Sequence, residues 1–372
     1  MEKIRRHDID WLRVIAIGLL LIYHSAIGFQ PWGVFIQFIQ NNDFLEWIWV
    51  PMSMLNIWRI PLLFFVSGMG VYFAIQSRDW KALLLERSQR ILLPYLFGML
   101  TIVPLQILIW RNYYMQDLTY LPHPSHLWFL GNIFVYVLVC TPLFFYLQKN
   151  SGGKFQSTLD KILGNPLGLL LVTVPFIIEV KLVQPETFEL YALTSHGFWI
   201  GFIAFIFGFL FIYSGKAFWK LITKWNWIFL AISVGLYFYR IQDGDFKSND
   251  YLTVLESCCW IFSVLGLGHK YLNKPSETLT YLSQAAYPVY ILHMFFLFLG
   301  SWLIFHFEIA AFSKWILVTL FTFMGSFGLY EFVIKRIWFL RPLFGLKLNR
   351  KMQELTNESN TNRLIDESLQ SQ

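Results

Sequence analysis

The chain has 372 residues, of which 56% are hydrophobic and only 14% are charged, and its mean hydropathy is +0.51. A typical soluble domain carries about 25% charged residues, so this composition excludes an ordinary soluble protein and predicts a polytopic helical membrane protein. The net charge of +6 does not indicate nucleic-acid binding, because the basic residues are distributed as membrane topology requires.

Ten apolar segments are long enough to cross about 30 Å of hydrocarbon. In chain order they are 11–30, 52–77, 91–110, 127–148, 166–184, 197–215, 225–240, 251–269, 281–305 and 315–335. The segment 31–50 is rich in aromatic residues and is expected at the membrane interface. We therefore expect an all-α bundle in which residues 1–350 form one membrane domain. Residues 351–372 are polar, lack apolar periodicity and are expected to form a disordered tail.

An even number of spans places both termini on one side of the membrane, and lysine and arginine indicate which side it is. Loops on the terminal side contain 21 of these residues, and loops on the opposite side contain 5. The positive-inside rule therefore predicts that both termini are cytoplasmic. The first span is not expected to be a cleaved signal peptide, because it contains Arg13 and no A-x-A-like site follows it.

The first span contains DWLRVIAIGLLLIYHS, residues 10–25, with two costly polar residues, Arg13 and His24. Eleven residues at about 100° each turn the helix to about 20° past three full turns, so both side chains share one face about 16 Å apart. Arg13 alone would also suit snorkelling to lipid headgroups. His24 lies too deep for that, and the residues alone leave a structural and a functional histidine equally open.

The second span contains WRIPLLFFVSGMG, residues 58–70. Its small residues favour close packing between helices. Arg59 lies in its outer part, where an interface anchor and a pocket residue for a polar substrate compete equally. The next loop, RDWKALLLERSQRILLP (78–94), places Arg87 and Arg90 three residues apart on one helix face. Topological charge explains most such clusters, but guanidinium groups also suit phosphate oxygens.

Further along, HPSHLWFLGNIFVY (123–136) brings His123 and His126 to the outer membrane edge. Their spacing would fit a metal, but no third ligand is evident, and we interpret them as an interfacial belt or a carbohydrate-facing rim. Three further ionisable groups within spans are Glu179, Glu256 and Glu331, to which we assign no role. Glu331 is placed to pair with a nearby arginine. His293 lies at mid-membrane in the ninth span.

The three cysteines all lie in apolar segments without metal-ligand spacing, and we expect free thiols and no metal site. The sequence contains no GxSxG, HExxH, Walker A or GxGxxG motif and no His-x4-Asp pair. No nucleophile elbow and no soluble glycerol-type acyltransferase arrangement is therefore indicated, and an ATP-driven pump is poorly supported.

The chain from about residue 5 to 348 resembles the acyltransferase 3 family of integral-membrane acyltransferases. The resemblance rests on DWLRVIAIGLLLIYHS, RIPLLFFVSG, ERSQRILLPYLFG, HLWFL and YPVYILH, in this order and spacing. The ending RPLFGLK (341–347) is most similar to the periplasmic-glucan succinyltransferase branch. In many relatives a serine precedes the tyrosine of the late motif, whereas Ala286 precedes Tyr287 here, so we assign that position no chemistry.

The resemblance implies transfer of an acyl group from a cytoplasmic donor to an acceptor outside the cytoplasmic membrane. By position, His24 matches the essential histidine of the family and Arg13 its partner. Arg87 and Arg90 match the arginine pair before the third span, and His293 matches a recurrent histidine of the late helix.

The resulting hypothesis is a multi-pass O-acyltransferase of the bacterial inner membrane, with acetyl-CoA or succinyl-CoA as co-substrate and an extracytoplasmic glycan as acceptor. His24 would be the general base with Arg13 as its partner, and Arg87 and Arg90 would bind the phosphates of CoA. Arg59 and His293 would bind substrate, and an acyl-histidine intermediate stays open. The alternative is a secondary transporter or a glycan or lipid flippase, although no repeat of broken helices in matching halves favours it.

Overall fold

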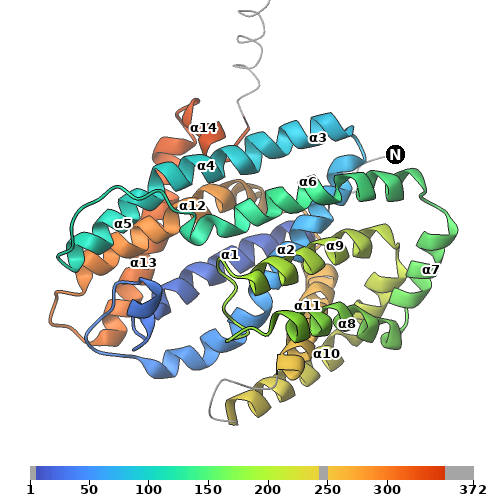
Figure 1. Cartoon of the computed structure of the whole chain (residues 1–372), viewed down its shortest axis with the longest axis horizontal. Helices are drawn as coiled ribbons and strands as arrows, with labels where there is room; N and C mark the ends of the chain where they lie inside the picture. The colour runs from blue at the N-terminus through green and yellow to red at the C-terminus, as the bar shows by residue number, and fades with distance from the viewer. Residues whose placement is uncertain (1–5, 243–249, 348–372) are drawn as a thin grey trace, which may run out of the picture.

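The computed structural model describes residues 6–242 and 250–347, and this part of the chain is a bundle of helices without strands (Figure 1). The long helices are α1 (His7–Ile27), α2 (Trp49–Ile75), α6 (Trp128–Lys149), α8 (Pro166–Val183), α9 (Ser195–Tyr213), α10 (Ala217–Gln242), α11 (Asp250–Tyr271), α12 (Glu277–Ile304) and α13 (Ala311–Leu329). The shorter helices are α3 (Trp80–Arg87), α4 (Leu93–Leu100), α5 (Ile102–Tyr113), α7 (Lys154–Leu163) and α14 (Leu340–Leu343), and the 3-10 and π turns are η1 (Gly33–Ile36), η2 (Glu46–Ile48), η3 (Ser88–Leu92), η4 (Ser125–Leu127) and η5 (Tyr330–Ile334).

Ten helical segments of the described residues are long and apolar enough to cross a membrane, as predicted. Nine are centred on the long helices, and the third span is the run from α3 to α5. Large apolar side chains lie exposed on the outside of the bundle, including Leu167, Leu182 and Met324 at 71%, 77% and 73% exposure. Such a surface suits lipid and not water, so the protein is a multi-pass membrane protein.

Most helix boundaries agree with the expected spans, but the third and the seventh begin earlier than expected, the third at Trp80 and not at residue 91. For the seventh we expected residues 225–240, whereas α10 begins eight residues earlier, at Ala217. Gly215 makes the preceding turn with a φ of +124°, which favours glycine, and Asp160 Oδ1 accepts a hydrogen bond from the Ala217 backbone N–H. The seventh helix therefore begins with an amphipathic section that contains Lys220 and Lys224, and the apolar stretch that we expected follows it. The expected tail, 351–372, lies outside the described residues.

The segment between the first two spans contains two short 3-10 turns, η1 and η2, and no long helix. Phe35 and Trp47 in this segment are 84% and 60% exposed. Exposed aromatic side chains beside a span are typical of a membrane interface, which agrees with the expected position of residues 31–50.

The third span is interrupted twice. A π turn, η3, separates α3 from α4, and Thr101 leaves helical geometry between α4 and α5, with a φ of −126°. Single π turns within helices occur frequently at functional sites, because they redirect the side chains that follow them. Here the π turn begins directly after Arg87 and includes Arg90.

Helix α1 crosses the middle of the bundle and contacts α2, α11, α12 and α13 (Figure 1). Its neighbours bring segments that are distant in the sequence to the face that carries Arg13 and His24. Helix α9 packs closely on α2. Helix α10 pairs with α11, and α12 pairs with α13. The core of the bundle therefore forms around α1, α2 and α12.

The close approach of α2 and α9 depends on two reciprocal glycines. A Cβ added at Gly68 would lie 1.9 Å from the carbonyl oxygen of Phe205, and one added at Gly208 would lie 2.0 Å from that of Phe65. Both distances are far below van der Waals contact, and both obstacles are backbone atoms that cannot rotate away. Small residues at such crossings let helix backbones approach within membranes.

We therefore predict that Gly68→Ala and Gly208→Ala each lower the stability of the purified protein by about 1–3 kcal/mol or more, because overpacking forces α2 and α9 apart. The measurement is the thermal unfolding midpoint in detergent. Gly235→Ala in α10 is the matched control, since a Cβ there meets no atom within 4 Å. An equal midpoint for all three variants would contradict the packing argument.

Candidate active site

The residues predicted as functional from α1 and α12 meet inside the bundle. His24 Nδ1 lies 2.8 Å from His293 Nε2, and the two rings are nearly parallel, with an interplanar angle of 10°. His293 is fully buried, whereas His24 is only half-buried. The pair therefore joins one accessible imidazole to one that is enclosed by protein.

The hydrogen bonds of this pair indicate where its protons lie. His293 Nδ1 is 2.6 Å from the carbonyl oxygen of Tyr290, which can only accept, so Nδ1 carries the proton of the neutral ring. Its Nε2 is then an acceptor, and His24 Nδ1 must donate to it. His24 Nε2 is left without a proton, and no described residue forms a hydrogen bond to it. This nitrogen is therefore available as a base.

A third histidine, His126, packs against this pair. Its ring lies edge to face on His293, with 5.0 Å between the ring centroids, and its Nε2 is 3.1 Å from the carbonyl oxygen of Ile291. The Tyr290 hydroxyl donates to the backbone carbonyl of His126. Our interpretation of His126 as an interfacial or carbohydrate-facing residue is wrong, because its side chain is buried against α12. His123 instead accepts a hydrogen bond from the Ser125 N–H, 3.0 Å away.

Sequence spacing gave no signal for this third histidine, since a position beside His293 arises only from the packing of η4 on α12. The three rings nevertheless do not form a metal centre. Nε2 of His126 and Nδ1 of His293 both point at backbone carbonyls, and no group of three ligating side chains in the described residues has the arrangement of a metal site. The three cysteines are free and buried.

Arg59 is fully buried in α2, close to the histidine pair. Its guanidinium lies 4.3 Å from the centre of the Tyr23 ring and interacts electrostatically with both His24 and His293. Among the described residues its hydrogen bond is a long contact of 3.4 Å from Nη1 to the Leu19 carbonyl oxygen. Nε and Nη2 are buried without a partner among the described residues. A buried cation whose N–H donors lack acceptors destabilises the folded protein unless a negatively charged group binds to it.

Arg13 and Arg87 meet near the beginning of α1. Arg87 Nη2 contacts the Gly70 carbonyl oxygen at 3.5 Å, and a Cβ on Gly70 would lie 3.9 Å from Arg13 Nη2. Arg13 Nη1 is 3.3 Å from Asp10 Oδ1. Arg87 Nε is buried and lacks a hydrogen-bond partner in the described residues. The predicted partner of His24 and the predicted phosphate ligand are therefore neighbours at one end of the site.

Arg90 takes a different direction from Arg87, although we expected them to share a helix face. The π turn that begins after Arg87 rotates Arg90 outward, so that its side chain is 45% exposed while that of Arg87 is 18% exposed. Glu86 lies between them, 3.1 Å from Arg90 and 3.5 Å from Arg87. Both arginines and Arg13 still interact electrostatically with Tyr287 of α12, so they belong to one cluster. We call Arg13, Arg87 and Arg90 the arginine cluster.

Helix α12 runs beside α1 and spans both parts of the site. Its Tyr287 lies by the arginine cluster, and its His293, six residues later, meets His24. Because both positions on α1 face α12, the structure confirms that Arg13 and His24 share a face. The two groups of side chains form a line along α1, with arginines at its beginning and histidines in its last turn.

Two further carboxylates within spans, Glu179 and Glu256, have partners. His196 Nδ1 lies 3.0 Å from Glu179, and Arg240 lies 2.8 Å from Glu256 and 3.2 Å from Glu189. Burial raises the pKa of Glu189, in the loop before α9, and Arg240 opposes this shift. Pairing of this kind offsets the free-energy cost of removing these charged groups from water, and we therefore assign these residues a structural role.

Glu331, expected to pair with an arginine, pairs instead with Lys335 at 2.9 Å. Lys335 lies one helical turn after Glu331, so the carboxylate of Glu331 pairs with a lysine of its own helical segment.

The contrast between the two buried arginines makes a stability prediction. Arg240→Met should destabilise the protein by about 3–5 kcal/mol, because it leaves Glu256 buried without its cation. Arg59→Met should leave the unfolding midpoint unchanged or raise it, because that guanidinium lacks a carboxylate partner among the described residues. Thermal unfolding of both variants in detergent measures the difference. A loss of stability in Arg59→Met as large as that in Arg240→Met would contradict this account of the site.

Comparison with known families agrees with this geometry. Residues 6–331, most of the chain, match the family described as an acyltransferase domain, Acyl_transf_3. Comparison with curated proteins and with solved structures gives no match. The family match identifies an enzyme, in place of the transporter or flippase considered from the sequence. The chain belongs to the acyltransferase 3 family and is a membrane acyltransferase.

Proposed function

We propose that the protein transfers an acetyl or succinyl group from acyl-CoA to a hydroxyl of an extracytoplasmic glycan, with His24 as the general base. The observation that carries this proposal is the hydrogen bond between His24 Nδ1 and His293 Nε2, which leaves His24 Nε2 free to accept a proton. The positive-inside distribution of charge supports cytoplasmic termini in a bacterial inner membrane.

The donor would enter at the end of the bundle that carries the arginine cluster. Guanidinium groups suit the oxygens of the CoA diphosphate, and Arg87 Nε, which lies 3.5 Å from Glu86, is buried without a hydrogen-bond partner in the described chain. From Arg13 the pantetheine arm would extend along α1 towards His24. The eleven residues between them rise about 16 Å, which suits an extended arm that carries a thioester at its end.

The chemical step begins with the acceptor hydroxyl. His24 Nε2 would take its proton as the oxygen attacks the thioester carbonyl, and a tetrahedral oxyanion would form. Collapse of this intermediate breaks the carbon–sulfur bond, and the proton on His24 passes to the leaving thiolate. The products are an ester of the acceptor and free CoA. His293 would act as a positioning residue, because it accepts from Nδ1 and so fixes the reactive tautomer.

Arg59 would supply positive charge to the same step. Its two unpartnered nitrogens match a negatively charged oxygen that appears only during the reaction, and donors of this kind contribute most in sites without water. The terminal carboxylate of a succinyl group would be a second suitable partner. The resemblance of residues 341–347 to the succinyltransferase branch supports this acyl group, and acetyl remains the other candidate.

The mechanism predicts graded effects in the histidine pair. His24→Ala should lower kcat by about 10²–10⁴-fold, since it removes the base. His293→Gln should retain more activity than His293→Ala, because the amide oxygen still accepts from His24 Nδ1. The measurement is steady-state acyl transfer from acetyl-CoA and succinyl-CoA by purified, folded protein.

His306→Ala is the matched control, because His306 is exposed and lies apart from the histidine pair. Wild-type turnover in His24→Ala would disprove the general-base role. Equal losses in His293→Gln and His293→Ala, with the pH profile unchanged, would leave His293 without a role in fixing the tautomer.

The donor site makes a separate prediction. Arg87→Gln should weaken CoA binding about tenfold or more, and Arg90→Gln should weaken it less, because the Arg90 side chain is more exposed than that of Arg87, whereas Glu86 lies near both. Isothermal titration of the purified variants with CoA measures both. Arg336→Gln, an exposed arginine outside the cluster, is the control. Unchanged affinity in Arg87→Gln would remove the arginine cluster from the donor site.

A further inference from the structure

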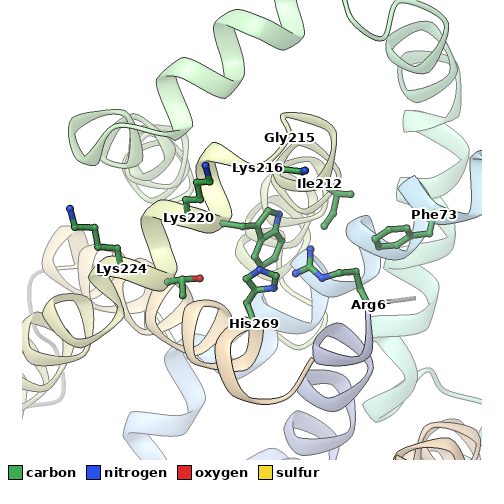
Figure 2. Close-up of a pocket in the computed structure, with 10 residues that line it drawn as sticks. Arg6, Phe73, Ile212, Gly215, Lys216, Lys220, Lys224 and His269 are labelled. Carbon is green, nitrogen blue, oxygen red and sulfur yellow. The ribbon is translucent and has the colours of Figure 1, made fainter. Parts of the chain in front are cut away.

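A second basic site, separate from the arginine cluster, lies where α1 and α10 begin (Figure 2). It is a pocket of about 660 Å³, and none of the residues of the arginine cluster lines it. Figure 2 shows Lys220 and Lys224 on one side of this pocket and Arg6 and Phe73 on the other.

Three lysines give the pocket its charge. Lys220 and Lys224, four residues apart, share a face at the start of α10, and Lys216 directly precedes this helix and also lines the pocket. All three are exposed, and none forms an ion pair with a carboxylate of the described residues. The nearby Asp160 caps α10 by accepting a hydrogen bond from the Ala217 N–H at 3.1 Å. The ammonium groups are therefore available to a ligand.

The inner wall of the pocket is already organised by other contacts. Arg6 lies 3.8 Å from the centre of the Trp219 ring, and its Nη2 is 2.6 Å from Asp8 Oδ2. His269 Nδ1 is 3.2 Å from the same carboxylate oxygen. Asp8 is thus occupied by Arg6 and His269 and does not neutralise the lysines. The hydroxyl of Thr223, which also lines the pocket, is buried without a partner in the described residues.

We propose that this pocket binds a phosphate group. Three ammonium groups and a free hydroxyl donor match its oxygens, whereas a neutral ligand would leave the positive charge uncompensated. The unpartnered Thr223 hydroxyl is an independent sign of a ligand, because a buried polar atom without a partner is unfavourable.

Two sources share this chemistry. One is the nucleotide end of CoA, whose 3′-phosphate lies far from the thioester, and this source rests on the proposed function. Its support is position, since Phe73 of the pocket lies one helical turn after Gly70, whose carbonyl oxygen contacts Arg87 and which lies near Arg13. The other source is the headgroup of an anionic phospholipid, which basic pockets between spans also bind.

The test uses a charge-matched pair of triple variants of the full chain. The pocket variant is Lys216→Gln, Lys220→Gln and Lys224→Gln. The control variant is Lys149→Gln, Lys154→Gln and Lys161→Gln, which removes three exposed lysines that do not line the pocket. Each protein is placed in phosphatidylcholine nanodiscs and titrated with CoA and with 3′-dephospho-CoA. Native mass spectrometry counts retained phosphatidylglycerol after incubation with mixed lipids.

If the pocket binds the nucleotide, wild type and control will prefer CoA over 3′-dephospho-CoA by about ten- to a hundredfold, and the pocket variant will lose this preference. If it binds lipid, the two nucleotides will bind alike, and only the pocket variant will retain less phosphatidylglycerol. The proposal is overturned if neither ligand distinguishes the pocket variant from the control. Neither readout requires acyl transfer, so inactivity of the enzyme would not imitate failure of this site.

Discussion

The structure depends on one constraint: an ionisable side chain within an apolar bundle must find a partner. Most such residues of the described chain meet it with a carboxylate or an imidazole, as in Glu179 with His196 and Glu256 with Arg240. These pairs connect α8 with α9 and α10 with α11, and they fix how those helices pack. Arg59 departs from this pattern, since its Nε and Nη2 are buried without a partner among the described residues. Groups left incompletely paired at a structural cost are where function is expected.

The two parts of the site are held together by a single pair of neighbouring helices. Helix α1 carries Arg13 and His24, and α12 carries Tyr287 and His293 at matching positions. A shift of α12 by one turn would separate both contacts at once. The packing of α12 on α1 therefore determines both the geometry of the histidine pair and the location of the arginine cluster. Helix α2, which carries Arg59, is positioned by its glycine-mediated crossing with α9.

The sequence was sufficient for the spans and for the shared face of Arg13 and His24, because hydropathy and helical periodicity are local properties. It singled out His24 and His293 separately through family resemblance, and it did not predict that the two rings form a hydrogen-bonded pair. It failed where packing decides: His126 joins the pair through η4, and the π turn at Ser88–Leu92 rotates Arg90 away from Arg87. Residue spacing assumes a regular helix, and neither a π turn nor a neighbour from a distant segment leaves a periodic signal.

The tautomer of His24 follows from backbone as much as from side chains. The Tyr290 carbonyl oxygen accepts a hydrogen bond from His293 Nδ1, so His293 Nε2 is unprotonated. His293 Nε2 therefore accepts a hydrogen bond from His24 Nδ1, 2.8 Å away, and Nε2 of His24 is left without a proton. A carboxylate in place of His293 would fix the same tautomer but would place a full negative charge in the apolar bundle, at a cost that a neutral ring avoids. An imidazole supported by a backbone carbonyl would therefore orient the proposed base without adding a charge, which suits a site built within a membrane.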